Sequence, residues 1–272
     1  MYSFEWLTAQ IAKITQQYPF VHTEIIGTSR MGKPLYALCI GNGPRAISYN
    51  ASHHANEWIT TPLLMQFVEV YCKHLRNHPE DNLSSKNTLY AIPMVNPDGV
   101  DAVLNGTKPP EWKANICGVD LNSNYPASWE LARINKYAQG FITPGPKGYV
   151  GTAPLCEPES SALVAYTLLR DFDMTLSLHT QGEEIYWRYR HFSPKNAKEL
   201  ANKMEAVSGY LAEDVPDDAS HGGYRDWFIE TFNRPGFTIE CGLGENPLPF
   251  EDFTDIYKKV EPILWLGLRE LI

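Results

Sequence analysis

The amino-acid sequence predicts an α/β fold in which helices cover both faces of a mixed, mostly parallel sheet. The main observation is that short strand-like apolar runs alternate along the chain with longer segments of helical periodicity. The length of 272 residues and the apolar content of 43% suit one large unit with a sizeable buried core. No internal repeat or linker interrupts the sequence. We therefore expect residues 1–272 to form a single domain.

The N-terminal part of the chain is expected to begin with an amphipathic helix and to continue with strands. Phe4, Leu7 and Ile11 recur at helical spacing. The NPDG tetrapeptide at residues 96–99 predicts a turn, because proline presets φ and glycine accepts a positive φ. We expect helices at residues 3–17 and 60–76, and strands at residues 22–26, 35–40, 45–52 and 87–95.

The middle of the chain, from about residue 100 to 157, is rich in glycine, proline and asparagine. This composition indicates irregular structure, and such a long irregular stretch inside a compact protein is usually functional. Beyond it, the alternation of helices and strands resumes. We expect helices at residues 158–172, 195–213 and 250–271, and strands at residues 174–179 and 236–240.

Composition argues against several classes of protein. The net charge of -9 disfavours a nucleic-acid partner. The five cysteines are scattered without a CxxC pair, which favours free thiols over a thiolate metal site or a disulfide framework. No apolar run reaches the roughly 18 residues of a membrane span. The first twenty residues do not resemble a signal peptide, which favours the cytoplasm. The alternative is a secreted or wall-associated protein whose leader or wall-binding module is absent from this chain.

Four side chains with metal or acid–base chemistry are expected at the carboxyl ends of strands. His54 and Glu57 follow the strand at 45–52, three residues apart, so one turn lets both face a single ion. His179 and Glu240 each end a predicted strand. Ligands of open α/β sheets bind at this edge. Zinc in hydrolases takes three ligands from His, Glu or Asp and leaves a fourth position for water. We therefore expect His54, Glu57 and His179 to share an ion.

Other polar residues are given supporting or structural roles. A ligating imidazole needs its second nitrogen held, and Asp120 in the segment CGVDLNSNYP is a candidate for that contact. His53 is expected to orient its neighbours or to be structural. The remaining histidines that we interpret as ordinary core or surface residues are His22, His74, His78 and His191.

Five motifs occur in a specific order: HHANEWIT, NPDG, GVDLNSNYP, SLHTQGEE and GFTIECG. Over residues 20–270 the chain thereby resembles the zinc carboxypeptidase (funnelin) superfamily. The resemblance implies an eight-stranded mixed sheet and one zinc ion per chain, held by His54, Glu57 and His179. It also implies that Glu240 is the general base, which takes a proton from the attacking water, and that Asp120 supports His54.

The chain departs from this family at three positions. Family exopeptidases clamp the terminal carboxylate of the substrate with an Asn-Arg pair, which here is Asn122-Ser123. Serine cannot replace the bidentate arginine, so a strict carboxypeptidase is disfavoured unless another arginine substitutes. The family's pocket tyrosine is replaced by Asp218, and Tyr224 is a candidate for that contact. Lys113 lies near the position of a family arginine that polarises the scissile carbonyl, and it is our candidate for stabilising the oxyanion.

The specificity pocket points to one branch of the family. Arg225 falls where the family places the floor of this pocket, and a basic residue there should select an acidic group. Together with HTQGEEIYW, this resembles the γ-D-glutamyl-diamino acid endopeptidases, which cut between γ-D-glutamate and meso-diaminopimelate (or lysine) in bacterial wall peptides. Arg225 would bind the diaminopimelate carboxylate, and Glu183 or Glu184 its amine, unless that acidic pair is a solvated turn.

Three alternatives remain open on the sequence alone. The runner-up is a carboxypeptidase that removes acidic residues from free C-termini. A deacylase or esterase on the same scaffold is a further possibility. A zinc-containing binding module without catalysis belongs to a different class, and it is disfavoured because Glu240 is retained.

Overall fold

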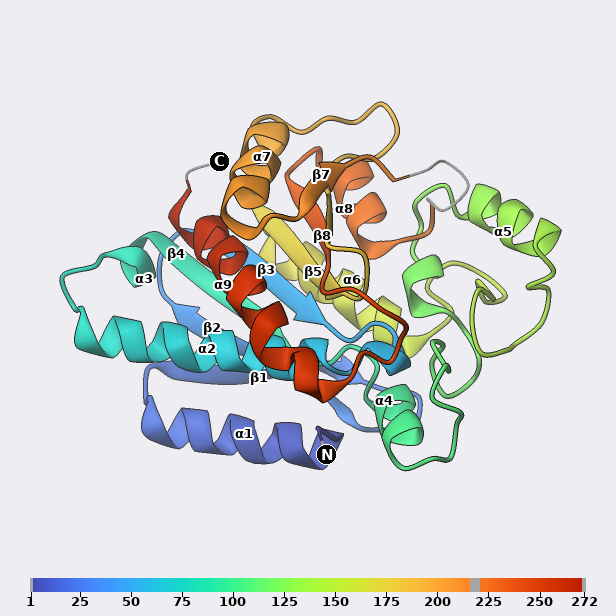
Figure 1. Ribbon diagram of the computed structural model, residues 1–272, viewed down its shortest axis with the longest axis horizontal. Coiled ribbons are helices and arrows are strands. Elements are labelled where there is room, and N and C mark those ends of the chain that lie inside the picture. Colours follow the sequence, from blue (N-terminus) through green and yellow to red (C-terminus); the bar gives the residue numbers. More distant parts are fainter. Residues whose placement is uncertain (1, 216–220, 271–272) are drawn as a thin grey trace.

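A mixed sheet forms the centre of the computed structural model, which describes residues 2–215 and 221–270 (Figure 1). Eight strands within these residues have the order β1-β2-β4-β3-β5-β8-β6-β7. The central strands β4, β3, β5 and β8 run parallel to one another. The pairs β1–β2, β2–β4 and β6–β8 are antiparallel, and β7 runs parallel to β6. The strands are β1 (Val21–Thr28), β2 (Pro34–Gly41), β3 (Arg45–Ala51), β4 (Asn87–Ile92), β5 (Met174–His179), β6 (Glu184–Tyr186), β7 (Leu211–Glu213) and β8 (Gly236–Glu240).

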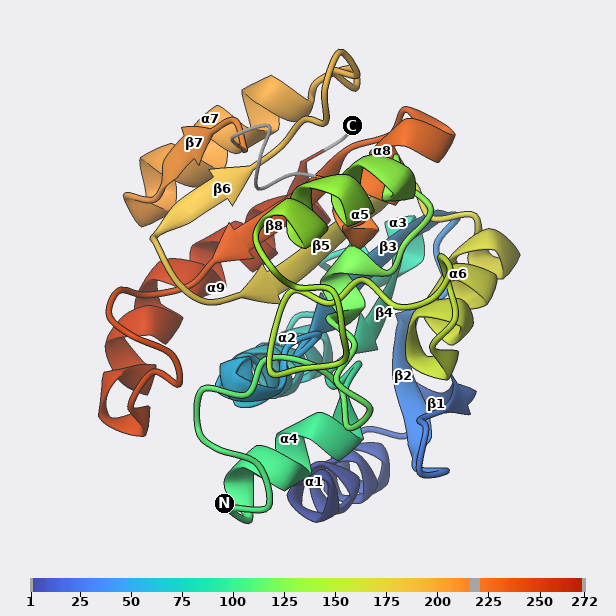
Figure 2. The same ribbon diagram turned by 90° about the vertical axis from the view of Figure 1, so that its right-hand side faces the viewer.

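Helices pack on both faces of this sheet, which confirms the predicted fold class (Figures 1 and 2). Buried residues of α1, α2, α7 and α9 form one core with one face of the sheet, and those of α6 and α8 form a second core on the other face. The helices are α1 (Phe4–Gln17), α2 (Thr60–Asn77), α3 (Leu83–Lys86), α4 (Pro97–Leu104), α5 (Trp129–Ala138), α6 (Pro158–Arg170), α7 (Ala197–Ser208), α8 (Tyr224–Phe232) and α9 (Phe253–Arg269). None of the helices in the described residues combines the length and the apolar character needed to cross a bilayer.

The predicted turn at residues 96–99 is the start of helix α4, and the preceding strand β4 ends at Ile92 rather than at residue 95. Asn96 caps this helix, because its side-chain oxygen accepts a hydrogen bond from the amide of Gly99 at 3.1 Å. Pro97 occupies the first helical position, where its missing N–H is not needed. Asparagine and proline favour turns and helix starts alike, so the tetrapeptide could not distinguish the two.

The predicted helix at residues 195–213 is wrong beyond residue 208. Helix α7 ends at Ser208 because Gly209 adopts a left-handed conformation with φ 77°. Residues Leu211–Glu213 then form β7, which pairs with β6. Sequence periodicity missed the two three-residue strands, β6 and β7, and it also missed the helices α5 and α8. The last helix begins at Phe253, after a 3-10 turn at Phe250–Asp252, rather than at residue 250.

The central parallel strands bring the candidate site residues to one edge of the sheet. Strand β5 lies between β3 and β8, and His179 at the end of β5 is the register partner of Glu240 at the end of β8. The 3-10 turn η1 (Ala55–Glu57) follows β3 at the same edge. Residues from distant parts of the sequence therefore meet at the carboxyl ends of neighbouring strands.

The contact between β3 and α9 yields a stability prediction. The hydroxyl of Tyr49 donates to the carbonyl of Leu264 at 2.7 Å, and Gly267 leaves room for this ring. A Cβ at Gly267 would overlap the Tyr49 hydroxyl and lie 2.9 Å from Cε of Met174. We expect Gly267→Ala to lower the free energy of unfolding by about 1–3 kcal/mol in urea titrations, because overpacking outweighs the gain in helix propensity.

The control for this measurement is Gly145→Ala, whose added Cβ would meet only Thr143 O, at 3.7 Å. This variant should stay within about 0.5 kcal/mol of the parent. Adding Tyr49→Phe to Gly267→Ala should recover part of the loss, because the overlapping hydroxyl is gone. A Gly267→Ala protein as stable as the parent would contradict the prediction.

Candidate metal centre and active site

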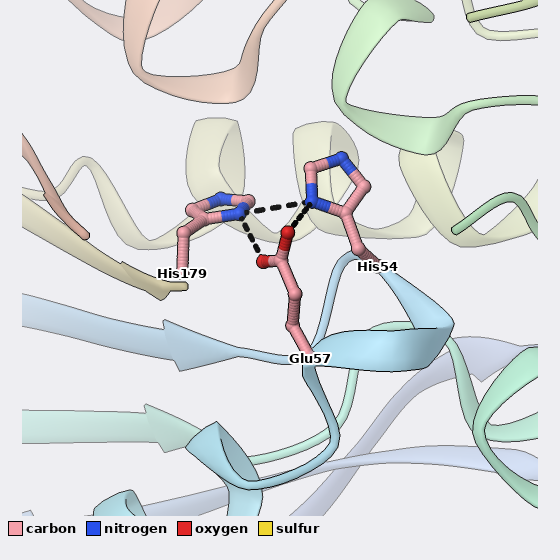
Figure 3. Close-up of side chains that lie close together, drawn as sticks. All are labelled: His54, Glu57 and His179. Carbon is pink, nitrogen blue, oxygen red and sulfur yellow. Dashed lines mark hydrogen bonds and ion pairs between the residues drawn. The ribbon is translucent and has the colours of Figure 1, made fainter. Parts of the chain in front are cut away.

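Three buried side chains converge at the carboxyl edge of the sheet (Figure 3). His54 comes from the loop after β3, Glu57 from the turn η1, and His179 from the last position of β5. His54 Nδ1 lies 2.8 Å from Glu57 Oε1, and His179 Nδ1 lies 2.9 Å from Glu57 Oε2. The two Nδ1 atoms are 3.1 Å apart. The structure thus brings together the three predicted ligands, whose candidate donor atoms all lie within 4.8 Å of one another.

The chemistry of this donor set fits a zinc ion. Two imidazole nitrogens and a carboxylate are a common set of protein ligands in zinc hydrolases. Ligands at 2.0–2.1 Å in tetrahedral geometry are about 3.3 Å apart, close to the 3.1 Å between the two Nδ1 atoms. The imidazole of His54 is also held in the tautomer that leaves Nδ1 available, because its Nε2 lies 3.2 Å from Asp120 Oδ1.

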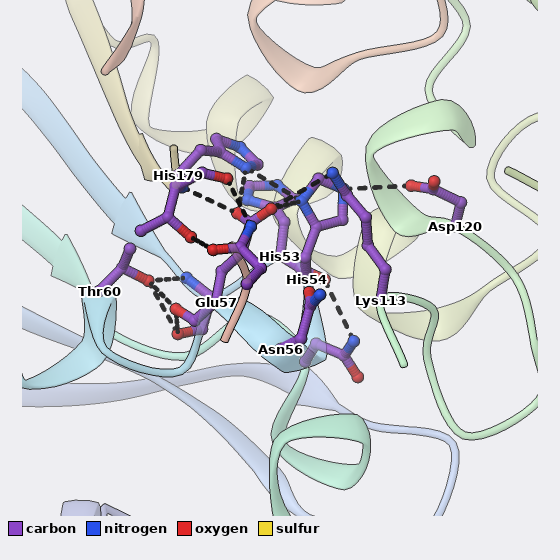
Figure 4. Close-up of polar contacts among 12 residues, drawn as sticks. His53, His54, Asn56, Glu57, Thr60, Lys113, Asp120 and His179 are labelled. Atoms are coloured by element: carbon purple, nitrogen blue, oxygen red, sulfur yellow. Dashed lines mark hydrogen bonds and ion pairs between the residues drawn. The ribbon is translucent and has the colours of Figure 1, made fainter. Parts of the chain in front are cut away.

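Asp120, whose contact with His54 is drawn in Figure 4, is itself held by the loop that follows α5. Its second carboxylate oxygen accepts a hydrogen bond from the amide of Gly148 at 3.0 Å. Burial opposes the charged form of Asp120, but the neighbouring His54 holds the pKa of this carboxyl well below its usual range. Burial likewise disfavours the protonated form of His54, and Glu57 and Asp120 outweigh it and raise the pKa of this imidazole. The structure therefore places Asp120 where the predicted supporting contact requires it.

Lys113 and His53 border the three converging side chains (Figure 4). Lys113 Nζ lies 3.3 Å from Glu57 Oε1, and the backbone carbonyl of Lys113 accepts a hydrogen bond from Ala55 at 3.0 Å. The ring of His53 stacks on that of His179 with centroids 5.4 Å apart, and its Nε2 lies 3.0 Å from the hydroxyl of Tyr125. Despite burial, the charges of His54, Lys113 and His179 hold the pKa of Glu57 well below its usual range. The carboxylate of Glu57 is thus kept ionised.

Glu240 stands beside the three converging side chains at the end of β8. Removal from solvent, and then the charge of Glu57, raise the pKa of Glu240 to about 8, while Lys113 acts in the opposite direction. A bound dication would lower this pKa, because a nearby positive charge favours the carboxylate. A carboxyl group with a pKa near neutrality is suited to accept and return a proton.

A small pocket of about 100 Å³ opens next to Glu240. Arg225 lies in it with 5% of its surface exposed, and its Nε and Nη2 bind the carboxylate of Asp226. Its Nη1 is buried and has no hydrogen-bond partner among the residues that the structure describes. The lining residues are Asn122, Ser123, Tyr186, Val215, His221, Gly223, Arg225, Asp226, Thr238 and Glu240. Arg225, which lines the pocket, therefore has a buried guanidinium N–H without a partner among the described residues.

Asn122 and Ser123 line this pocket, as expected for substrate-binding residues, but Tyr224 does not. The ring of Tyr224 is fully buried, and its hydroxyl lies 2.8 Å from the hydroxyl of Thr167 in the core under α6 and α8. Its amide donates to Asn122 Oδ1 at 3.0 Å, so it positions Asn122 rather than replacing the family tyrosine. Asp218, the residue at the family tyrosine's position, lies outside the described residues.

The structure distinguishes the two candidate acceptors for a substrate amine, Glu183 and Glu184. Glu183 binds Nζ of Lys259 at 2.6 Å, so its charge is already paired. Glu184 is the register partner of Glu240 and accepts a hydrogen bond from the hydroxyl of Tyr186, which lines the pocket. Glu184 is therefore the better placed of the two.

Several residues at the site were not found by sequence reasoning. Tyr186 and Asp226 line the pocket, and Thr180 donates its amide to Glu57 Oε2 at 3.2 Å. Asp226 had a local signal, since a carboxylate next to a buried arginine is a natural partner. Tyr186 and Thr180 had none, because their contacts depend on how separate loops pack.

Comparisons with known proteins agree with this geometry. Residues 7–261 match the zinc carboxypeptidase family. The chain is 40% identical to Gamma-D-glutamyl-L-diamino acid endopeptidase 1 of Lysinibacillus sphaericus, across 98% of this chain and 72% of that protein. It is 39% identical to YqgT of Bacillus subtilis (strain 168), across 95% of this chain and 75% of that protein. The crystal structure of thrombin activatable fibrinolysis inhibitor has the same fold, with a TM-score of 0.80 and 22% identity over 98% of this chain and 73% of that one.

The chain therefore belongs to the zinc carboxypeptidase family of metallopeptidases. This membership confirms the predicted resemblance and the predicted enzyme class.

The contact between His54 and Asp120 leads to a prediction about the zinc affinity of the protein. We expect Asp120→Asn to weaken zinc binding about tenfold or more, because the amide no longer stabilises the orientation and basicity of the imidazole. Zinc affinity would be measured by competition with a chromophoric chelator. The matched control is Asp81→Asn, which changes another histidine–aspartate pair, His74 with Asp81 at 2.8 Å. Equal zinc affinity in the two variants would contradict the role of Asp120.

Proposed function

We propose that this chain hydrolyses the bond between γ-D-glutamate and meso-diaminopimelate, or lysine, in peptides derived from bacterial peptidoglycan. In this proposal residues 1–272 act as one catalytic domain that binds one Zn²⁺ through His54, Glu57 and His179. The observation that carries the proposal is the buried Arg225, whose Nη1 has no partner among the residues that the structure describes, in a pocket that reaches Glu240. The identity of 40% to an enzyme named for the same bond supports it.

The protein's own residues have distinct parts in this reaction. Zinc, when bound, supplies Lewis-acid polarisation of the scissile carbonyl and lowers the pKa of water. Glu240 takes a proton from the attacking water and returns it to the leaving amine. Lys113, whose ammonium group is 3.3 Å from Glu57, is proposed to stabilise the negative charge that develops on the carbonyl oxygen. Asp120 keeps His54 in the tautomer that the metal needs.

Substrate selection is explained by the charges of the pocket. Diaminopimelate carries a carboxylate and an amine at the far end of its side chain. We assign the carboxylate to Nη1 of Arg225, since an arginine–carboxylate pair removes the cost of a buried unsatisfied N–H. Glu184, through its contact with Tyr186, is the proposed neighbour of the amine. Asn122 and Ser123 border the same pocket, and Ser123 stands where family exopeptidases have the arginine that clamps a terminal carboxylate.

A carboxypeptidase that removes C-terminal acidic residues is the alternative, because Arg225 could accept an acidic side chain as well. The serine at position 123 speaks against it, since serine cannot form the bidentate contact that holds a free C-terminus. The two functions differ on the C-terminal side of the selected residue: an exopeptidase needs a free carboxylate there, and an endopeptidase does not.

The test uses L-Ala-γ-D-Glu-meso-diaminopimelate and the same peptide extended by D-alanine. We expect cleavage of both between glutamate and diaminopimelate, with products identified by mass, and full inhibition by a chelator. Glu240→Gln should keep its zinc and lose turnover by orders of magnitude, because it cannot accept a proton. Cleavage of only the unextended peptide, or activity that survives chelation, would refute the proposal.

The assignment of Arg225 predicts a change of specificity. Replacing the ion pair together, as Arg225→Met with Asp226→Asn, avoids a lone buried charge. We expect kcat/KM for the diaminopimelate peptide to fall about 10–100-fold, equivalent to about 1.5–3 kcal/mol for a hydrogen bond to a charged group. The corresponding lysine peptide should change much less, because it lacks the distal carboxylate. An unchanged ratio between the two substrates would show that Arg225 does not read this carboxylate.

A further inference from the structure

Thr180, the residue after His179, joins the metal ligand Glu57 to a second loop of the protein. Its backbone amide donates to Glu57 Oε2 at 3.2 Å. Its hydroxyl donates to Asn246 Oδ1 at 2.7 Å, and its carbonyl accepts a hydrogen bond from Asn246 Nδ2 at 2.9 Å. Both ends of the Asn246 amide are therefore engaged by one residue, whose remaining polar group points at the ligand carboxylate.

The loop that carries Asn246 is anchored independently of this contact. It leaves β8 directly after Glu240, and the amide of Cys241 donates to the carbonyl of His179 at 2.8 Å. Farther along, the side chain of Leu248 is 1% exposed and belongs to the main core. Asn246 thus projects from a segment that is fixed at both sides.

Because Thr180 is buried, losing its hydrogen bonds with Asn246 would be energetically costly. Thr180 is 3% exposed, so its carbonyl and hydroxyl need protein partners, and Asn246 supplies both. Without Asn246 the backbone of Thr180 can rotate about φ and ψ until its carbonyl and hydroxyl find other partners. Its amide, which belongs to the preceding peptide, is then no longer held in the direction of Glu57. Hydrogen bonds of this kind orient the carboxylates that bind metals, and their loss typically weakens metal binding by 10–100-fold.

We propose that Asn246 is a positioning residue, which holds Thr180 so that its amide fixes the Glu57 carboxylate for the metal ion. The inference rests on the metal site of the proposed function. It adds a residue that lies outside the ligand set and outside the five family motifs.

The experiment measures the zinc dissociation constant of purified enzyme by chelator competition, together with the melting temperature of the metal-free protein. We expect Asn246→Ala to raise the zinc dissociation constant about tenfold. Asn246→Asp should do the same, because it keeps an acceptor for the hydroxyl but places a carboxylate oxygen against the Thr180 carbonyl. Thr180→Val should resemble Asn246→Ala, and Thr180→Ser, which keeps the hydroxyl, should restore wild-type affinity.

The matched control is Asn42→Ala, an exposed asparagine after β2 at the opposite edge of the sheet. At saturating zinc, kcat of Asn246→Ala should recover towards that of the parent with KM unchanged, which a general loss of packing would not allow. If the Asn246 variants bind zinc as tightly as Asn42→Ala does, the proposed role of Asn246 is wrong, and the proposed function is not affected. A parent enzyme without zinc would instead overturn the proposed function.

Discussion

The buried carboxylate of Glu57 is the group on which the site depends. It is 1% exposed, and the groups around it are His54 in the same loop, Lys113, and the consecutive residues His179 and Thr180 at the end of β5. An ion in such a place costs several kcal/mol unless it is paired and hydrogen-bonded. The fold must therefore bring these segments to one point before the carboxylate can remain charged. This requirement explains why the ligands lie at the carboxyl edge of the central strands, with His179 on the last residue of β5 and with His54 and Glu57 directly after β3.

The sequence could predict those features that arise from local spacing and from the rules of parallel sheets. His54 and Glu57 are one turn apart, and His179 and Glu240 each end an apolar strand, so their meeting at one sheet edge could be inferred from the topology. The mixed sheet with helices on both faces could be inferred in the same way and is confirmed. The strands that carry His179 and Glu240 have only six and five residues, but each is an apolar run that ends in a polar side chain, and this pattern marks them in the sequence.

Features that depend on packing between distant residues could not be predicted. The strands β6 and β7 are three residues long and leave no periodic signal. Glu183 had two interpretations on sequence grounds, and its pairing with Lys259, 76 positions later, is visible only in the fold. Analogy with the family pattern predicts Tyr224 at the pocket. Its hydroxyl instead contacts that of Thr167 in the core.

The pairing of His179 with Glu240 has a consequence for how this protein can change. Successive side chains of a strand point to opposite faces, so adding or deleting one residue inside β5 would turn the imidazole towards the wrong side of the sheet, and the same holds for the carboxylate of β8. Length variation in this enzyme is thus confined to the segments between strands. The pocket residues that lie between strands, such as Asn122 and Ser123, are free to diversify, while a change of one residue in the length of β5 or β8 would misdirect a side chain of the site.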